Sequence, residues 1–312
     1  MPDTPTNPAR RHALECMVWA GSAVVWTVAG GIPRSRLIGT ANAAGTGSFT
    51  FAQISDSHIG FAREPNMDTP GTLQAAIDQV RALPVKPAMI LHTGDVSHLS
   101  KPAEFDTAEK INATSGLDIH YVPGEHDMLV DDGKPFIERF QKGTKQGAPG
   151  GAFYSFDQGG VHFVGLNNVT NLAAGGLGHL GEAQLAWLES DLKGRAASQP
   201  IVVFAHIPLW TVYAEWGWGT EDAARALTAL KRFGSVTVLN GHIHQVMQKV
   251  EGHVAFHTAR STAFPQPAPG AAPSPGPMKV EPGRLRAMLG TASVSMVRTD
   301  TPLAIVDAPL GA

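Results

Sequence analysis

The chain has 312 residues, enough for one large domain or two small ones that need no disulfide bonds for stability. Its formal net charge of -3 gives no electrostatic reason to expect binding to nucleic acid or to an acidic membrane surface. The single cysteine, Cys16, excludes a disulfide framework and a cysteine zinc site. Any metal ion must therefore be bound by histidine and carboxylate side chains.

The N-terminal residues have the order of an export signal. Arg10 and Arg11 precede an apolar run at 17–32, and Ala41-Asn42-Ala43 has the small-residue pattern of a signal peptidase site. The arginine pair resembles a twin-arginine signal, although Glu15 stands where that motif usually has a basic residue. An ordinary secretory signal and an uncleaved membrane anchor are the alternatives.

We therefore expect residues 1–44 to be a twin-arginine signal peptide that engages the export machinery. Residues 45–312 are expected to form a single domain that works in the periplasm or outside the cell. After cleavage of the signal we expect no stable membrane association and no role as a nucleic-acid scaffold.

Hydrophobic periodicity predicts the order of strands and helices in the remaining chain. Short apolar or alternating runs predict strands at 48–55, 88–92, 117–122, 152–156, 161–166, 201–205, 236–239, 246–250 and 254–257. Apolar residues at helical spacing predict helices at 72–83, 103–114, 181–192 and 221–233. This order predicts an α/β sandwich with helices on both outer faces.

Two further segments complete the prediction. The segment 264–282 is dominated by Pro, Ala and Gly, a composition typical of an extended surface loop. It could instead form a rim of a cleft, because it closely follows a histidine motif. The tail at 285–306 has alternating apolar positions and is predicted to return to the sheet as two edge strands.

Polar motifs follow five of the predicted strands. They are Asp56-Ser57-His58, Gly94-Asp95, Gly124-Glu125-His126-Asp127, His206 and Gly241-His242-Ile243-His244. Each motif alone is better explained as a surface turn or a hydrogen-bonded core residue. In open α/β sheets, however, ligands bind at the carboxyl ends of strands, and Asp and His are suited to divalent or iron ions. Together the motifs predict one metal site.

The ordered motifs resemble the calcineurin-like metallophosphoesterase superfamily over about residues 50 to 260. The resemblance implies an α/β fold, a four-layer sandwich of two mixed β-sheets flanked by α-helices. It implies a first metal ion bound by Asp56, His58 and His244, a bridging Asp95, and a second metal ion bound by His206, His242 and the residue at 125. It also implies that His126 protonates the leaving oxygen and that Asp127 orients His126.

Two cations that share a carboxylate lower the pKa of a bridging water. They also stabilise the attacking and the leaving oxygen of an in-line phosphoryl displacement. We therefore expect an enzyme that hydrolyses a small-molecule phosphate ester by attack of a bridging hydroxide at a dinuclear centre. Manganese, iron and zinc all suit these ligands. The alternatives are a phosphomonoesterase that scavenges phosphate and a non-catalytic relative that binds metal or phosphate.

Glu125 departs from the superfamily pattern, which usually has Asn at this place. The usual site, with two divalent ions, a hydroxide and two aspartates, has a net charge of about +1. A Glu125 that ligates a metal ion lowers this net charge to about 0. Three features would compensate for this lower net charge: a trivalent iron, a nearby cation such as Arg63 or Arg260, or a less charged substrate. A phosphodiester monoanion fits the last option, so we expect a phosphodiesterase. Alternatively, Glu125 points away from the metals.

Four residues are candidates for contact with substrate: Arg63, His98, Trp210 and Arg260. His98 stands where purple acid phosphatases carry a metal-binding Tyr, and the absence of that Tyr argues against a purple acid phosphatase. Trp210 is the first of several aromatic residues after His206, which could stack on a substrate or pack beneath their own loop.

Overall fold

The structure is a computed structural model that describes residues 24–29, 32–37, 49–142, 147, 151–281, 283–296 and 303–311. The chain divides into the units Met1–Ser48 and Phe49–Ala312. In the first unit, β1 (Val24–Ala29) pairs antiparallel with β2 (Ile32–Leu37). The arginine pair and the expected cleavage site lie outside the described residues, so export stays a prediction that cell fractionation can test. Among the described residues, no helix is both long and apolar enough to cross a membrane.

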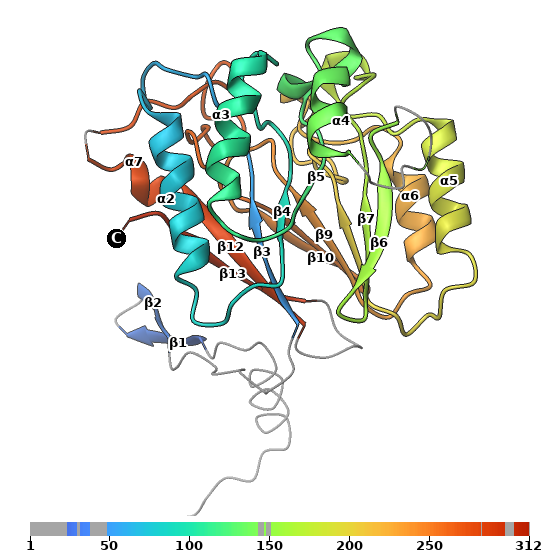
Figure 1. The fold of residues 1–312 in the computed structure, drawn as a ribbon. Coiled ribbons are helices and arrows are strands. Elements are labelled where there is room, and N and C mark those ends of the chain that lie inside the picture. The colour runs from blue at the N-terminus through green and yellow to red at the C-terminus, as the bar shows by residue number, and fades with distance from the viewer. Residues whose placement is uncertain are drawn as a thin grey trace, which may run out of the picture. The chain divides into compact units, whose positions relative to one another are not determined.

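The second unit contains two mixed β-sheets (Figure 1). The five-stranded sheet has the order β13 (Ala304–Pro309), β12 (Gly290–Ser295), β3 (Thr50–Ile54), β4 (Ile90–His92) and β5 (Ile119–Tyr121). The six-stranded sheet has the order β10 (Gln248–Glu251), β11 (Val254–Thr258), β9 (Val236–Asn240), β8 (Ile201–Phe204), β7 (Val161–Gly165) and β6 (Tyr154–Gln158). Strands β3, β4 and β5 are parallel, as are β7, β8, β9 and β11, and the other strands pair antiparallel.

Helices cover the outer face of each sheet (Figure 1). The five-stranded sheet packs against α2 (Thr69–Arg81), α3 (Pro102–Ala113) and α4 (Lys134–Phe140) through one hydrophobic cluster. The six-stranded sheet packs against α5 (Glu182–Leu192) and α6 (Ala223–Leu230) through a second cluster. A third cluster fills the space between the sheets. The predicted four-layer α/β sandwich is confirmed.

Alternation along β3 shows how one strand serves two layers. Phe51 belongs to the cluster between the sheets, whereas Ala52 and Ile54 belong to the cluster beneath α2 and α3. Successive side chains of a strand point to opposite faces, so a strand buried on both sides is mostly apolar. The buried amide of Gln53 is an exception, and its Nε2 donates to Thr93 Oγ1 and to the carbonyl oxygen of Asn240. Removing a side chain such as Phe51 from water contributes about 1.5–3 kcal/mol to the free energy of unfolding.

The C-terminal part differs from the prediction. The segment begins with a short helix, α7 (Leu285–Met288), and β12 lies inside the sheet because it pairs with both β3 and β13. Only β13 is an edge strand, so the prediction of two edge strands was wrong for β12. The helix α4 was missed because its seven residues are too few for a helical period to stand out.

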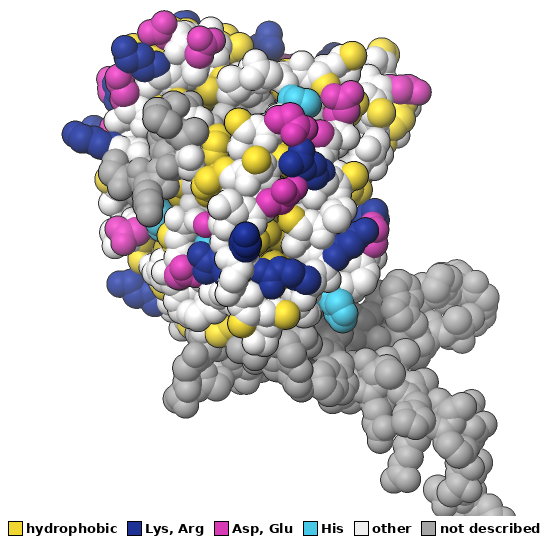
Figure 2. All heavy atoms as spheres, turned by 90° about the vertical axis from the view of Figure 1, so that its right-hand side faces the viewer, with side chains coloured by type: hydrophobic (Ala, Val, Ile, Leu, Met, Phe, Trp, Pro, Cys, Tyr) yellow, Lys and Arg dark blue, Asp and Glu magenta, His cyan; other side chains and the backbone are white. Residues whose placement is uncertain are grey.

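The face that carries α5 and α6 shows acidic and basic side chains interspersed (Figure 2). Arg225 of α6 reaches α5 across this face, where its Nε lies 2.8 Å from Glu189 Oε1. Charges of both signs therefore meet over these two helices, and this face presents no uniformly basic surface that would attract nucleic acid.

A buried histidine joins the β6–β7 hairpin to α5. The Nδ1 atom of His162 lies 3.0 Å from Asp157 Oδ1, and its Nε2 atom lies 2.7 Å from Asp191 Oδ2. Burial alone raises the pKa of Asp191, but hydrogen bonds from His162 and Ser155 outweigh it and hold that pKa below its usual value. The ionised carboxylate of Asp191 is therefore stabilised by folding.

Replacing Asp191 by Asn is expected to lower the free energy of unfolding by about 1.5–3 kcal/mol at pH 7, because a charged hydrogen bond to a buried ring is lost. A depressed carboxyl pKa stabilises the fold above its unfolded value of about 3.9 and loses that effect as the pH falls below it. The difference in free energy of unfolding between the wild type and Asp191→Asn, measured by urea titration, should therefore shrink below about pH 4. Glu138→Gln, at an exposed surface pair, is the control; a difference independent of pH would contradict the assignment.

Candidate metal centre

The predicted ligand residues all follow parallel strands. Asp56 and His58 come after β3, Asp95 after β4 and Glu125 after β5, while the other sheet contributes His206 after β8 and the double-histidine turn after β9. The carboxyl ends of parallel strands meet at one edge of their sheet. Here the edges of two packed sheets lie together, so loops far apart in sequence share one site.

One group of possible metal ligands consists of Asp56, His58 and His244. The His244 Nε2 atom lies 3.2 Å from Asp56 Oδ1 and 3.2 Å from His58 Nε2. The His58 Nε2 atom also lies 3.4 Å from Asp95 Oδ2, and all four side chains are buried. Carboxylate and imidazole atoms at this spacing suit a borderline divalent ion.

A second group consists of Glu125, His206 and His242. The Oε2 atom of Glu125 lies 3.0 Å from His206 Nε2, and its Oε1 atom lies 3.1 Å from His242 Nδ1. Asp95 connects the two groups, because its Oδ2 atom is 3.4 Å from His206 Nε2 as well as from His58 Nε2. The alternative in which Glu125 points away from the site does not match these contacts.

Backbone carbonyls fix the rings of two of these histidines. The Nδ1 atom of His206 lies 2.7 Å from the Thr93 carbonyl oxygen, and that of His244 lies 2.6 Å from the Phe264 carbonyl oxygen. A carbonyl oxygen only accepts, so Nδ1 carries a proton and Nε2 is the ring nitrogen directed into the site.

Burial and neighbouring charges shift the pKa values of the candidate ligands. Burial lowers the pKa of His206, but Asp95 and Glu125 outweigh it and raise that pKa well above its usual value, so this ring has to lose a proton when it binds a metal ion. Burial alone raises the pKa of Glu125, but His242 and His206 outweigh it and hold the pKa well below its usual value. In the same way, His244 outweighs burial and lowers the pKa of Asp56 to about 2. Burial and the neighbouring His126 hold the pKa of His58 well below its usual range. Ionised carboxylates and a neutral imidazole are the ligand states.

Five of the predicted ligands have a left-handed backbone, with φ between 41° and 69°: Asp56, His58, Asp95, His242 and His244. Residues other than glycine rarely adopt this conformation, which costs on the order of 1 kcal/mol or more each. Such strain accumulates where the surrounding structure holds a functional geometry in place. The packed strands before these turns provide that support.

Glycines allow the loops to approach one another. A Cβ atom on Gly124 would lie 2.0 Å from Asp95 Oδ1, and one on Gly241 would lie 2.1 Å from Ser55 Oγ. Both glycines directly precede candidate ligands. The side chains of Asp95 and Ser55 already occupy the space that a methyl group on these glycines would need.

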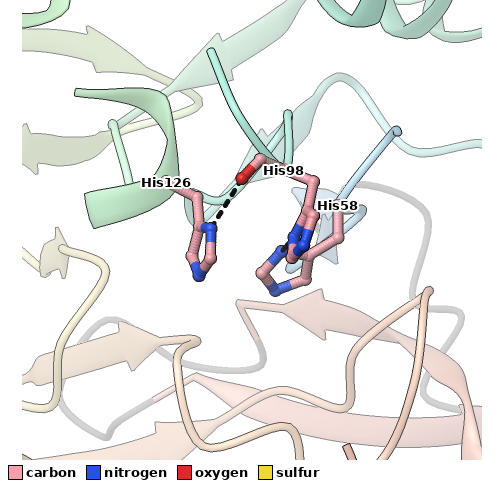
Figure 3. A group of neighbouring side chains, drawn as sticks. All are labelled: His58, His98 and His126. Carbon is pink, nitrogen blue, oxygen red and sulfur yellow. Dashed lines mark hydrogen bonds between the residues drawn. The ribbon is translucent and has the colours of Figure 1, made fainter. Parts of the chain in front are cut away.

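His126 lies beside both groups, in the middle of a short 3-10 helix, Glu125–Asp127. Its Nδ1 atom lies 2.7 Å from the carbonyl oxygen of His98 (Figure 3), so Nδ1 donates and Nε2 is the nitrogen free to exchange a proton. Burial lowers the pKa of His126, but the charges of Asp95 and Glu125 outweigh it and raise the pKa above its usual value.

Asp127 has a different position from the one we expected. Its carboxylate accepts hydrogen bonds from the backbone N–H groups of Val96, Ser97 and Gly124, at 2.8 to 3.0 Å, and from the Ser97 hydroxyl. The His98 carbonyl, and not Asp127, is the group that holds the His126 ring. Burial and the charge of Asp95 raise the pKa of Asp127 to about 7. Its role in this structure is to fasten the loop after β4 to the loop after β5.

A pocket of about 150 Å³ opens beside these side chains. Its described lining includes two of the four predicted substrate contacts, Arg63 and His98. The His98 ring lies 3.4 Å from His58 Nδ1, on the side of His58 away from the metal ligands, and stacks on the His126 ring (Figure 3). Sequence reasoning missed two lining residues, Phe264 and Gln266, whose only signal was proximity to the double-histidine turn.

The other two predicted contacts lie elsewhere. Trp210 packs against the cluster beneath α5 and α6, with its ring centroid 5.1 Å from that of Phe256. Arg260 Nη1 donates to the carbonyl oxygens of Ala287 and Met288 at the end of α7. Both predictions were wrong, because proximity in sequence to a ligand does not place a side chain in the pocket.

Comparison with known proteins identifies the family. The model for calcineurin-like phosphoesterases matches residues 49–246, which contain all five motifs. The chain belongs to the calcineurin-like phosphoesterase family. It is 24% identical over 222 residues to a 3′,5′-cyclic-nucleotide phosphodiesterase of Nostoc sp., covering 69% of this chain and 79% of the relative. It is 25% identical over 228 residues to a glycerophosphodiester phosphodiesterase of Enterobacter lignolyticus, covering 69% and 78%.

Solved structures support the same fold. A dimetal phosphatase from Danio rerio superposes with a TM-score of 0.61 at 15% identity, covering 84% of this chain and 99% of that one. Members of this family are metal-dependent phosphoesterases, and the two groups of candidate ligands found here have the donor types that two metal ions require.

Gly124→Ala is expected to weaken metal binding at least tenfold, because the added methyl group would displace Asp95, which connects the two ligand groups. Isothermal titration with Mn²⁺ measures the change. Gly234→Ala is the matched control, since its Cβ would come no closer than 3.9 Å to Ala197 O. Equal Mn²⁺ affinities of Gly124→Ala and the wild type would contradict this role of the glycine.

Proposed function

We propose that this chain is a metal-dependent phosphodiesterase that uses two metal ions. The observation that carries the proposal is the convergence of two ligand groups and His126 on a single pocket. Asp56, His58 and His244 would hold one ion, while Glu125, His206 and His242 would hold the other, with Asp95 shared. When bound, two ions supply an activated water and neutralise charge on the phosphoryl group.

His126 is proposed as the general acid. The His98 carbonyl fixes its Nδ1–H, so Nε2 is the atom that can donate a proton to the departing oxygen. His126 lines the pocket beside Asp95 and Glu125, which places that nitrogen next to the ligand groups. The ring is held by a neutral carbonyl and by stacking on His98, so its orientation does not depend on a carboxylate partner.

Glu125 is proposed to set the charge preference of the site. Its carboxylate contacts two candidate ligands and adds one negative charge that an Asn would not carry. A phosphodiester has one negative charge near neutral pH, whereas a monoester approaches two, so Glu125 repels the diester less. Two relatives with phosphodiester substrates in their names support the same choice.

Glu125→Asn is expected to raise kcat/KM for p-nitrophenyl phosphate relative to methyl p-nitrophenyl phosphate on the order of tenfold, because one negative charge is removed. The wild type should prefer the diester. Elemental analysis of Glu125→Ala, which removes the ligand oxygen altogether, should show the loss of one of the two metal ions at limiting metal concentration. Glu138→Gln is the remote control, and a wild-type preference for the monoester would overturn the phosphodiesterase proposal.

His126→Asn is expected to lower kcat for a dialkyl phosphate by about 10²–10⁴, the usual contribution of a general acid. Turnover of methyl p-nitrophenyl phosphate should fall much less, because p-nitrophenolate leaves without protonation. Phosphorus NMR and absorbance follow the two reactions. An equal loss with both substrates would show that His126 does not act as the acid.

A further inference from the structure

Ser261 connects the loop after β3 to the segment that follows β11. Its side chain is buried, and its Oγ donates a hydrogen bond to the carbonyl oxygen of Asp56 at 2.8 Å. The same Oγ accepts hydrogen bonds from the backbone N–H groups of Ala263, at 2.8 Å, and Phe264, at 3.1 Å. A hydroxyl has one donor and two acceptor positions, so all of them are used at this junction.

The junction holds Asp56 in its left-handed conformation, with a φ angle of 53°. The N–H of Asp56 donates to the carbonyl oxygen of Gly94 at 2.9 Å, and its own carbonyl oxygen accepts from Ser261. The backbone of Asp56 is therefore bound on both sides of its Cα atom. A strained residue keeps its conformation only where its surroundings fix it, so these two hydrogen bonds also set the direction of the Asp56 carboxylate.

Phe264 extends the junction to the two histidines of the first ligand group. Its carbonyl oxygen lies 2.6 Å from His244 Nδ1, which donates to it. Its ring stacks on the ring of His58, with the centroids 4.8 Å apart and the planes inclined by 27°. All three candidate ligands of the first group therefore contact Ser261 directly or through Phe264.

The Pro-rich segment begins at this junction and forms a wall of the pocket. Met278 N donates to the carbonyl oxygen of Pro265 at 2.9 Å, which brings the two ends of the segment together. Pro275 and Pro277 line the pocket, so the segment is a rim of the cleft and not a plain surface loop. Phe264 directly precedes this segment, so it is held from the side of Ser261 and from the side of the wall.

The second ligand group, formed by Glu125, His206 and His242, has other supports. The ring of His206 is held by the Thr93 carbonyl oxygen in the loop after β4. Among the described residues, the hydrogen bonds and ion pairs of this group reach the junction only through the Asp56 carboxylate, which accepts from His242 N at 3.0 Å. A change at Ser261 should therefore affect the first group much more than the second.

We propose that Ser261 is a positioning residue for the first metal ion. Its hydroxyl does not contact the ion, but it fixes Asp56 directly and His58 and His244 through Phe264, and so determines how tightly this group binds a metal ion. Residues 261–264 lie beyond the part of the chain that matches the family model, which ends at residue 246. The inference rests on the two-metal centre proposed above.

Ser261→Ala is best tested in two backgrounds, each of which keeps one ligand group intact: His206→Ala keeps the first group and His244→Ala keeps the second. The EPR signal of free Mn²⁺ during a titration gives the Kd of the remaining group. In the His206→Ala background, Ser261→Ala should raise this Kd about 10–100-fold, the usual effect of losing a group that orients metal ligands. In the His244→Ala background it should change the Kd less than about threefold.

Ser155→Ala is the matched control, because it also removes a hydroxyl hydrogen bond, 2.7 Å from Oγ to Asp191 Oδ1, but away from both ligand groups. It should leave both Kd values unchanged. If Ser261→Ala does not fold, Ser261→Cys replaces it, since a thiol keeps the shape of the side chain but donates weakly. Equal losses in the two backgrounds, or no loss in either, would overturn this inference alone. A wild type that binds fewer than two Mn²⁺ ions would overturn the two-metal proposal and this inference with it.

Discussion

The concentration of acidic and imidazole groups at one buried edge is the constraint on which the structure depends. Asp95 lies at its centre, with one carboxylate oxygen 3.4 Å from histidines of both ligand groups. Without cations, such a cluster is stable only because histidines and carboxylates alternate and each lowers the cost of burying the other. Neighbouring histidines hold Asp56 and Glu125 ionised, while burial and His126 hold His58 neutral, and these are the forms that take up metal ions.

The two sheets supply the rigidity that this cluster needs. Four of the five ligand loops begin at the ends of β3, β4, β8 and β9, whose side chains are all buried, so these strands cannot shift without exposing apolar surface. The strained left-handed turns at Asp56 and Asp95, and the close approach of Gly124 to Asp95, are held by that packing. Asp127 adds a polar connection by binding three backbone amides from two loops.

His98 and Glu125 connect the candidate ligand groups with His126. Glu125 contacts both histidines of the second ligand group and adds a negative charge there. The carbonyl oxygen of His98 holds the ring of His126, the proposed acid, and the ring of His98 lies against the candidate ligand His58 (Figure 3). The loop after β4 therefore contacts both the proposed acid and the first ligand group, and a change in that loop would affect both.

The layers of the fold and the candidate ligand set could be predicted from the sequence, because period-two apolar runs, helical spacing and motifs at strand ends are all local patterns. It could not place Asp127, Trp210 or Arg260, whose partners are backbone groups or core side chains distant along the chain. Nor did it show that the Pro-rich segment closes back through Pro265 and Met278 to form a wall. These points depend on tertiary contacts, since the direction of a side chain is set by contacts between segments that no local pattern encodes.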